Sequence, residues 1–403
     1  MSETRLRIAL LCTTLTTGGA ETFVLRLASA LHAAGHDVSV LVLRGDRVEW
    51  EMVRTIAPDV HVLACETPFL RWVQRLDGAL YLAGGSTSIE RSWQCRWLQR
   101  VLRDLGAQVL HSHLMTSDLV AARACAAVGI PWVTTMHGDY IDYEREGRNR
   151  AARIQDFGEC VSRIETSVSA IVCISEVQRK QVARVFPKLT AVGKVRKIYN
   201  GYPQPTLGVD VQIVDELRRI PEDALVIGMV ARGIREKGWD VLLQAWRQAQ
   251  LKDSWLVLVG DGPRIAELRE EELDSRVVFA GNVLRPLDWI ARFDIACLPT
   301  RYLPESLPTV VIEYLALDKP VVATDVGEIA AMLRAPGPES AGELIALSDE
   351  GSMAAELAIL LRKLASSPDL RAGLIKNSQA AFAAFDMRAC LRDYCALYAE
   401  VIG

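Results

Sequence analysis

The sequence predicts an α/β fold built from two doubly wound parallel sheets. Continuous apolar runs of strand length alternate with helical patterns, and the alternation restarts at residue 225 after a turn-rich stretch at 203–224. The chain has 403 residues and a hydrophobic content of 50%, which is enough for two or three complete cores. We therefore expect one domain on each side of a linker at 203–224.

The first domain opens with an apolar run at 6–12, a glycine turn and a helical pattern at 21–34. Gly18 and Gly19 lie just before this helix, where the missing side chains let a ligand approach the backbone. Because the pair is not part of a GxGxxG fingerprint, it argues against a dinucleotide-binding oxidoreductase. Further strands are predicted at 38–43, 109–113, 132–137 and 170–175, and a further helix at 117–128.

The second domain is predicted to contain a strand–loop–helix–strand unit at 294–328. Ser306 is expected to be the N-cap of the helix, and Pro308 to lie in its first turn, where no N–H is needed. The last part of the chain, 351–403, is expected to be mostly helical. A first strand is predicted within LVIGMVARGIREKG (225–238), and further strands at 255–259, 277–283, 295–298 and 321–324.

Two carboxylates flank the start of this helix. Glu305 precedes the helix, and Glu313 lies about five residues into it, roughly 7.5 Å along the axis. The unpaired N–H groups and the positive dipole end of a helix form an anion site. An acid on each side of a bound phosphate would accept hydrogen bonds from hydroxyls at either end, which suits a sugar–diphosphate–ribose.

The spacing Glu305-x7-Glu313 resembles the motif of retaining glycosyltransferases of family 4. The resemblance implies the GT-B architecture, with two facing Rossmann-like domains, the donor in the cleft between them, and a C-terminal helix that crosses back to the first. It also implies that Glu305 holds hydroxyls of the donor sugar and that Glu313 holds the ribose of the nucleotide. The implied domains are 1–202 with 386–403 on the acceptor side, and 203–385 on the nucleotide-sugar side.

The helix start departs from the usual form of the motif. Ser306, Leu307 and Pro308 replace a glycine-rich turn, and Tyr314 stands where alanine is common. Pro308 removes one backbone donor to the phosphates. The resemblance places Ser306, Leu307 and Thr309 in the nucleotide site.

Two cations follow the first strand of the second domain. Arg232 and Lys237 match the family pattern GRxxxxKG, with Ala231 in place of the first glycine. The resemblance assigns them to the diphosphate, whose charge grows as the glycosidic bond breaks. It places the nucleotide base beside Val283. The chain has no DxD triplet, so these cations and the helix dipole are expected to replace a metal.

His137 ends the strand at 132–137, at the edge where open α/β sheets bind ligands. The resemblance implies that this histidine contacts the donor sugar near the reaction centre, and that Gly18 and Gly19 belong to a loop which closes over the phosphates and the sugar. His111 and His113 could ligate a metal from alternating strand positions, but no third ligand is evident. We therefore expect no metal site.

Composition favours a protein of the cytoplasm. The nine cysteines form no CxxC pair and most lie in apolar surroundings, which predicts buried free thiols. No apolar run reaches the ~18 residues of a membrane span, and the first residues lack the pattern of a signal peptide. Nothing in the charge or the motifs indicates a nucleic acid as a partner.

Charge is unevenly distributed. Residues 1–200 contain 25 Lys and Arg against 20 Asp and Glu, and residues 201–403 contain 21 against 30. The basic first half makes an anionic membrane surface a candidate partner, with random surface variation as the alternative. A helix that contains Trp93, Trp97 and the arginines Arg96, Arg100 and Arg103 is either a membrane-facing helix or an ordinary surface helix.

The sequence thus predicts a metal-independent, retaining transferase of the hexosyltransferase type. It would move a sugar from a nucleotide-diphosphate sugar to a hydroxyl of a lipid-linked or cell-envelope glycan, in the cytoplasm or peripherally at the inner face of the membrane. The alternatives are a nucleotide-sugar epimerase or hydrolase on the same fold, and a transferase with a soluble small-molecule acceptor.

Overall fold

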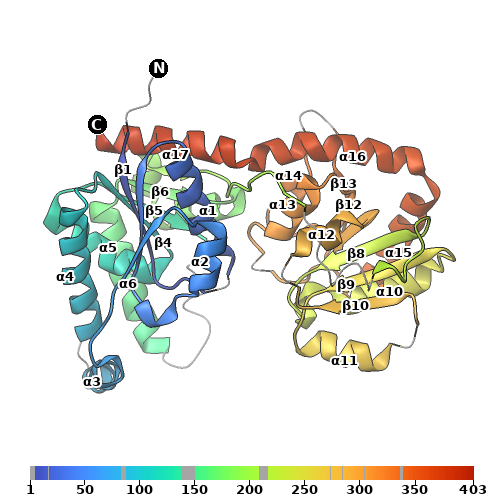
Figure 1. Ribbon diagram of the computed structural model, residues 1–403, viewed down its shortest axis with the longest axis horizontal. Coiled ribbons are helices and arrows are strands. Elements are labelled where there is room, and N and C mark those ends of the chain that lie inside the picture. The colour runs from blue at the N-terminus through green and yellow to red at the C-terminus, as the bar shows by residue number, and fades with distance from the viewer. Residues whose placement is uncertain are drawn as a thin grey trace. The chain divides into compact units, whose positions relative to one another are not determined.

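The computed structural model describes residues 5–16, 18–82, 88–137, 150–207, 217–272, 274–283, 285–303, 305–335 and 339–403. The chain divides into two compact units. The first consists of Met1–Gly201 and Met387–Gly403, and the second is Tyr202–Asp386 (Figure 1). Each unit is a parallel sheet with helices on both faces, which confirms the predicted fold class.

The first unit contains a seven-stranded parallel sheet in the order β3-β2-β1-β4-β5-β6-β7. The order reverses beside the central strand β1, which pairs with β2 on one side and β4 on the other. This is the doubly wound pattern, in which ligands bind outside the carboxyl ends of the strands at the reversal. The strands are β1 (Arg7–Cys12), β2 (Asp37–Val42), β3 (His61–Ala64), β4 (Val109–His113), β5 (Trp132–Met136), β6 (Ala170–Cys173) and β7 (Val195–Lys197).

Side chains of the central strands alternate between two cores. In β1, Ile8 and Leu10 face one core, whereas Ala9 and Leu11 face the other. The first core is covered by α1 (Gly19–Ala33), α2 (Trp50–Ile56) and α17 (Met387–Ile402). The second is covered by α4 (Ile89–Asp104), α5 (Met115–Val128), α6 (Arg150–Ser167), α7 (Glu176–Val185) and α8 (Pro187–Ala191).

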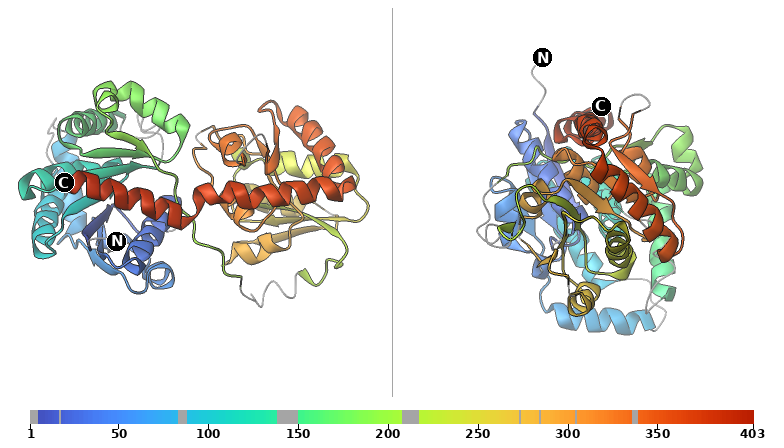
Figure 2. Two further views of the ribbon diagram at one scale, coloured as in Figure 1. Left: turned by 90° about the horizontal axis from the view of Figure 1, so that it is seen from above. Right: turned by 90° about the vertical axis from the view of Figure 1, so that its right-hand side faces the viewer.

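The C-terminal helix α17 completes the core of the first unit. It lies along the same sheet face as α1 (Figure 2). Its fully buried tyrosines Tyr394 and Tyr398 pack among the apolar side chains of β1, β2 and α1. The phenol of Tyr398 lies 2.7 Å from Nδ1 of His111 in β4, so polar contacts also tie the helix to the sheet. The family resemblance implies this return of the last helix to the first domain, and the structure shows it.

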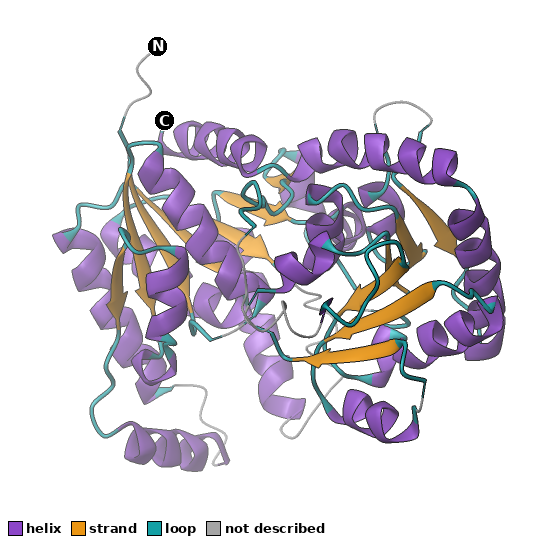
Figure 3. Cartoon of the chain, turned by 45° about the vertical axis from the view of Figure 1, so that its right-hand side comes forward, coloured by secondary structure: helices purple, strands orange, loops and turns teal. Residues whose placement is uncertain are grey.

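The second unit contains a six-stranded parallel sheet in the order β10-β9-β8-β11-β12-β13, flanked by helices (Figure 3). Its central strand β8 has β9 on one side and β11 on the other. The strands are β8 (Leu225–Val230), β9 (Ser254–Val259), β10 (Val277–Gly281), β11 (Ile295–Leu298), β12 (Val321–Thr324) and β13 (Gly342–Ile345). The helices are α10 (Trp239–Ala249), α11 (Pro263–Glu271), α12 (Pro286–Ala291), α13 (Thr309–Ala316), α14 (Ile329–Met332), α15 (Glu350–Ser366) and α16 (Pro368–Phe382).

The prediction that Ser306 caps the helix of the carboxylate motif is wrong. Helix α13 begins at Thr309, and its N-cap is Pro308, in an extended conformation with φ −67° and ψ 112°. A cap at Ser306 would require helical dihedrals at Leu307. The residue before a proline is disfavoured in that region because the proline ring clashes with it. Pro308 therefore stands just outside the helix, and Glu313 is the fifth helical residue.

The nine cysteines are free thiols, and eight of them are buried, as the sequence predicts. No helix among the described residues is long and apolar enough to cross a membrane.

Candidate functional site

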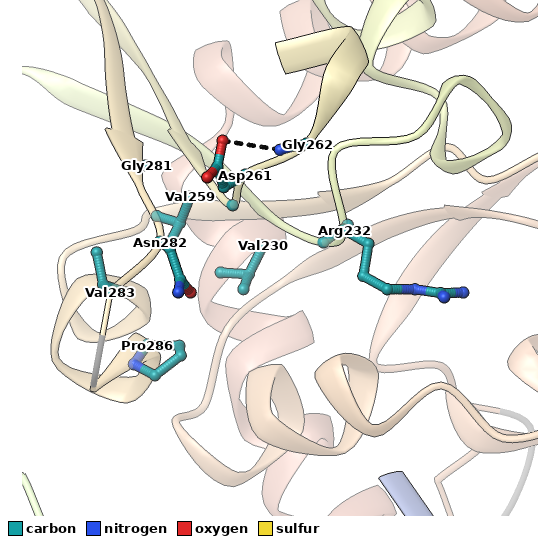
Figure 4. A pocket seen from close by; sticks show the side chains of 11 residues that line it. Val230, Arg232, Val259, Asp261, Gly262, Gly281, Asn282, Val283 and Pro286 are labelled. Atoms are coloured by element: carbon teal, nitrogen blue, oxygen red, sulfur yellow. Dashed lines mark hydrogen bonds between the residues drawn. The ribbon is translucent and has the colours of Figure 1, made fainter. Parts of the chain in front are cut away.

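A cavity of about 400 Å³ lies in the second unit at the carboxyl ends of β8, β9 and β10 (Figure 4). Two of the residues that the sequence analysis assigns to the nucleotide line it, namely Arg232 and Val283. Backbone and small side chains form most of the wall, so a flat or extended ligand meets few steric barriers. The lining consists of Val230, Ala231, Arg232, Val259, Gly260, Asp261, Gly262, Gly281, Asn282, Val283 and Pro286.

The wall of this cavity depends on glycine at two positions. The amide of Gly233 donates to the carbonyl of Asp261 at 2.8 Å, and the carbonyl of Gly233 accepts from the amide of Arg264 at 2.9 Å. Gly262 has φ +145°, and a Cβ there would lie 2.7 Å from the carbonyl oxygen of Gly233. Any side chain at 262 would therefore separate the two loops, so glycine keeps the loops after β8 and β9 in backbone contact.

Arg232 is an exposed cation on the rim of the cavity. Its side chain points away from the other labelled side chains (Figure 4). It forms no ion pair within the part of the chain that the structure describes. A guanidinium in this state is available to an anion, since no carboxylate has to be displaced first.

Lys237 and Glu305 form an ion pair with each other. Their side chains are only 11% and 10% exposed. The lysine ammonium also lies 5.0 Å from the ring centre of Tyr302, and the Thr300 hydroxyl lies 3.4 Å from the same Glu305 carboxylate oxygen. The two predicted site residues are thus brought together, although the sequence analysis assigns them to different parts of the donor.

The ion pair stands where the strand order of the second unit reverses. Lys237 belongs to the loop after β8, and Glu305 to the loop after β11, and these strands are neighbours in the sheet. Gly238 has φ +84°, and a Cβ on it would lie 1.9 Å from the carbonyl oxygen of Pro299, so the two loops touch through their backbones. This is the crevice in which open α/β sheets bind ligands.

The N-terminus of α13 adjoins Glu305. The predicted residues Ser306 and Leu307 form the half-buried bend between Glu305 and the first helical residue, Thr309. Gly327, which has φ +59°, packs on this bend, since its Cβ would lie 1.7 Å from the Glu305 carbonyl oxygen. The N-cap residue Pro308 makes no side-chain hydrogen bond to the helix start. The positive end of the helix dipole favours an anion at this place.

Glu313 has a partner that the sequence analysis missed. The hydroxyl of Tyr202, which is 4% exposed, donates to Oε1 of Glu313 at 3.0 Å. The two residues are 111 positions apart, so no local pattern connects them. Tyr202 belongs to the tract IYNGYP, but that tract does not indicate where its phenol points.

His137 directly follows β5 in the first unit, where it pairs with a second histidine. Nε2 of His137 lies 2.9 Å from Nδ1 of His113 at the end of β4, and the rings are stacked. Burial lowers the pKa of His137 to about 3, so the imidazole is neutral at ordinary pH. Its Nδ1 is buried and finds no partner among the described residues. Gly138 lies outside the described residues.

The Gly18 and Gly19 turn lies at the same edge of the first sheet. Gly18 is the N-cap of α1 with φ −167°, and Gly19 is the first helical residue. Gly18 is extended, so its backbone is not strained. The Thr14 hydroxyl donates to Glu21 at 3.2 Å across this turn. The loops that bear the glycines and His137 follow β1 and β5, so both lie at the carboxyl edge of the sheet.

The buried histidine His111 has a structural explanation. Its Nδ1 lies 2.7 Å from the Tyr398 hydroxyl, and its Nε2 lies 2.7 Å from Oγ1 of Thr135. Both ring nitrogens are thus engaged by hydroxyl groups. Within the described residues, no group of three or more His, Cys, Asp and Glu side chains is placed to hold a metal ion.

Comparison with known families gives two matches that together cover most of the chain. The model for glycosyltransferase family 4 matches residues 17–203, and the model for glycosyl transferases group 1 matches residues 224–363. These ranges fall largely in the first and second unit, respectively.

Individual relatives are distant. A phosphatidyl-myo-inositol mannosyltransferase of Mycolicibacterium smegmatis is 25% identical over 396 residues, which are 96% of this chain and 91% of that protein. TuaC of Bacillus subtilis, assigned to teichuronic acid biosynthesis, is 26% identical over 243 residues, 57% of this chain and 56% of that protein. The match to TuaC therefore spans about half the length of each chain.

A solved structure shares the fold. HepE from Anabaena in complex with UDP has a TM-score of 0.74, with 17% identity and coverage of 98% of this chain and 100% of that one. HepE has also been solved with UDP-glucose. The likeness extends over both units, which is the GT-B architecture. With the two family matches, it shows that this chain belongs to the group 1, family 4 glycosyltransferases, enzymes that transfer a sugar from a nucleotide sugar.

Proposed function

We propose that this protein is a retaining, metal-independent hexosyltransferase that uses a nucleotide-diphosphate hexose and a lipid-linked or cell-envelope glycan as acceptor. The observation that carries this proposal is the crevice at the ends of β8 and β11. There the Lys237–Glu305 pair, the exposed guanidinium of Arg232 and the N-terminus of α13 all belong to one unit. Such a set suits a diphosphate with a sugar on one side and a nucleoside on the other.

The proposed donor lies with its diphosphate against the cations. Arg232 and Lys237 neutralise the phosphates, and the N-terminal end of the α13 dipole adds further positive potential. The loop from Ser306 through Leu307 to Thr309 supplies backbone groups. The base enters the cavity beside Val283, and Glu313 accepts hydrogen bonds from the ribose hydroxyls.

Glu305 is proposed to hold hydroxyls of the sugar. In the structure its carboxylate is neutralised by Lys237, so the pair keeps both side chains in place without a ligand. When the diphosphate arrives, Lys237 gains two anionic neighbours and Glu305 gains hydroxyl donors. The single ion pair between Lys237 and Glu305 is then joined by charge-assisted hydrogen bonds to the phosphates and to the sugar hydroxyls, which favours the bound state.

The groups of the first unit are proposed to complete the donor site. His137 presents a neutral imidazole to the sugar, and its buried, unpartnered Nδ1 is the kind of atom that a ligand hydroxyl would satisfy. Gly18 and Gly19 let the phosphates and the sugar approach the backbone. In this assignment the acceptor domain is 1–202 with 386–403, and the donor domain is 203–385.

Retention at the anomeric carbon is proposed to follow from attack on the face of the leaving group. The acceptor oxygen bonds to the anomeric carbon as the bond from that carbon to the phosphate oxygen breaks. The acceptor proton passes to the departing phosphate oxygen. Arg232 and Lys237 stabilise the negative charge that develops on the diphosphate, a task for which a metal is not needed.

The acceptor class rests on relatives. One acts on phosphatidyl-myo-inositol and another is assigned to teichuronic acid biosynthesis, by their names. A small soluble acceptor is the second candidate, and a donor hydrolase or epimerase is the third. We place the enzyme at the inner face of the cytoplasmic membrane, where a lipid-linked acceptor would be met.

A donor screen tests the proposal. UDP-, GDP- and ADP-sugars are added one by one, and the unfolding free energy of the protein is measured. A ligand at 100 times its dissociation constant adds about 2.7 kcal/mol. We expect one nucleotide class to stabilise the protein, and product from that donor to appear only when an acceptor glycolipid is present, with the anomeric configuration kept. Turnover of the donor alone would instead favour a hydrolase or an epimerase.

A further inference from the structure

Helix α3 (Leu70–Leu82) presents an uncovered apolar row. Phe69, just before the helix, is 82% exposed, and Trp72 and Leu76 within it are 64% and 54% exposed. Trp72 and Leu76 are four residues apart in the helix and therefore lie on one face, and Phe69 precedes Trp72 by three residues. Single exposed apolar residues are ordinary, but one phenylalanine, one tryptophan and one leucine exposed so close together are not.

The helix is held in place by its opposite side. The Asp77 carboxylate accepts hydrogen bonds from the Ser88 hydroxyl at 2.7 Å and from the amides of Ile89 and Glu90 at 2.7 and 3.1 Å. It therefore caps the start of α4. Figures 1 and 3 both place α3 below the start of α4 and apart from the sheet. A polar anchor, and not burial of the apolar row, thus fixes the orientation of α3.

Cations border the apolar row. Arg71 and Arg75 are exposed, and the guanidinium of Arg75 lies 5.3 Å from the centre of the Trp72 ring. The acidic residue of α3, Asp77, is engaged with α4. The outward side of the helix therefore combines aromatic and aliphatic side chains with positive charge. This is the composition of a helix that lies in the interface of an anionic bilayer.

The location of α3 fits such a role. It follows β3 and precedes the first turn of α4, so it lies at the carboxyl edge of the first sheet. The loops with His137 and with Gly18 and Gly19 lie at this same edge. If α3 binds to a bilayer, the head group of a lipid-linked substrate in that bilayer would lie near these loops.

Helix α4 is the weaker candidate for this contact. Its residues Cys95, Leu98 and Leu102 are buried in the core, and Trp97 packs against the same core. It exposes the arginines 96, 100 and 103, with Trp93 at 42%. Helix α4 thus packs as a surface helix, and the uncovered apolar row belongs to α3.

We propose that α3 docks the first unit on an anionic lipid bilayer. Phe69, Trp72 and Leu76 enter the acyl boundary, and Arg71 and Arg75 stay among the phosphate head groups. This deepens the proposed function, on which it rests for the lipid-linked acceptor. A second copy of the chain is the rival occupant, but one row on a short helix is small beside the roughly 800 Å² per partner of a stable interface.

Vesicle co-sedimentation tests the proposal with the full chain. Phosphatidylcholine vesicles with and without phosphatidylglycerol are used at low and high salt. The wild type should sediment with the anionic vesicles and be released in part by salt. The double variant Trp72→Ser/Leu76→Ser should partition at least about tenfold less, because two large apolar side chains no longer enter the bilayer. Since both side chains are exposed, the fold should be unaffected.

Matched controls separate this surface from general stickiness. Val192→Ser and Ile359→Ser remove apolar side chains that are 69% and 58% exposed elsewhere, and should sediment like the wild type. Arg71→Gln/Arg75→Gln should lose the preference for anionic vesicles and retain weak, salt-insensitive binding.

Three results would contradict the proposal that α3 is the docking surface. The wild type could stay in the supernatant with anionic vesicles at low salt, or the Trp72→Ser/Leu76→Ser variant could bind these vesicles as well as the wild type does. The third result is that the wild type is a dimer and the Trp72→Ser/Leu76→Ser variant is a monomer. Nucleotide-sugar stabilisation, measured without vesicles, should be the same in both proteins. If no nucleotide sugar stabilises the wild type, the proposed function is contradicted. The vesicle experiment would still test the docking surface independently.

Discussion

The phenol of Tyr202 orients the carboxylate of Glu313 through a hydrogen bond of 3.0 Å. Tyr202 is itself fixed, because its amide donates to the carbonyl of Phe385 at 2.7 Å and its ring is buried. The acid proposed to hold the ribose is therefore preorganised by a residue far away in the sequence. Preorganisation lowers the entropy that binding must offset.

The first prediction concerns this pair. Glu313→Gln should weaken binding of the nucleoside diphosphate about tenfold or more, because a hydrogen bond to a charged group contributes roughly 1.5 to 3 kcal/mol. Tyr202→Phe removes only the orienting bond and should have a smaller effect. Isothermal titration calorimetry measures both. An affinity that Glu313→Gln leaves unchanged would remove Glu313 from the ribose site.

The second prediction concerns the cations. Arg232→Ala and Lys237→Ala should each lower kcat by about 10²-fold or more, since both are proposed to stabilise the leaving diphosphate. Arg235→Ala is the matched control, because that side chain lies in the same loop, is 62% exposed and pairs with Glu267. Near-normal turnover of either variant would show that the replaced residue, Arg232 or Lys237, does not stabilise the leaving diphosphate.

The third prediction separates the structural from the catalytic part of Lys237. Lys237→Ala leaves the nearly buried Glu305 without its cation, so this variant should also be less stable, whereas Arg232→Ala should not. Adding Glu305→Gln should restore much of the stability and none of the turnover. Urea unfolding beside the kinetic assay checks this. Equal stability of Lys237→Ala and the wild type would indicate that the ion pair contributes nothing to the fold.

The fourth prediction concerns metal removal. Because Arg232, Lys237 and the start of α13 are proposed to neutralise the diphosphate, EDTA should leave the transfer rate unchanged. The assay compares rates with EDTA, with added Mg²⁺ and with added Mn²⁺. An activity that EDTA abolishes and either ion restores would contradict the metal-independent mechanism.

The fifth prediction concerns pH. Burial lowers the pKa of His111 and of His137 to about 3, against about 6.5 in an unfolded chain. Between pH 6.5 and pH 3 these two histidines are protonated in the unfolded state and neutral in the folded state. The unfolding free energy must therefore fall as the pH drops through this range. At pH 5 the loss for the fully buried His111 is on the order of 2 kcal/mol. Urea unfolding from pH 7 to pH 4 measures it.

A matched variant tests the cause. In His111→Asn the unfolding free energy should depend less steeply on pH over the same range, although the variant is less stable at pH 7. A slope identical to that of the wild type would mean that His111 is not the group that resists protonation.

Buried strands were predictable because a parallel strand covered on both faces is a continuous apolar run. The strands Val109–His113, Ile295–Leu298 and Val321–Thr324 have the predicted bounds. The edge strands His61–Ala64 and Val195–Lys197 were not predicted. They are only four and three residues long and are not fully buried, so neither forms the long apolar run of a central strand.

The site was predictable in its residue types but not in its contacts. Glu305 and Glu313 lie in one loop and the helix that follows it, so their spacing can be read directly from the sequence. That Lys237 pairs with Glu305, or Tyr202 with Glu313, depends on which loops the strand order brings together. The same holds for α3, since the sequence does not reveal that Trp72 and Leu76 are left exposed by the described residues of its own unit.

The place of α17 in the fold has a consequence for biosynthesis. The core of the first unit needs Tyr394, Leu397 and Tyr398, which leave the ribosome only after the whole second unit has emerged. The second unit is one continuous segment, so it can fold during translation while the part of the first sheet that α17 covers is still exposed. A chaperone that binds apolar surface should therefore associate with nascent chains stalled before residue 387 and release them once α17 has emerged.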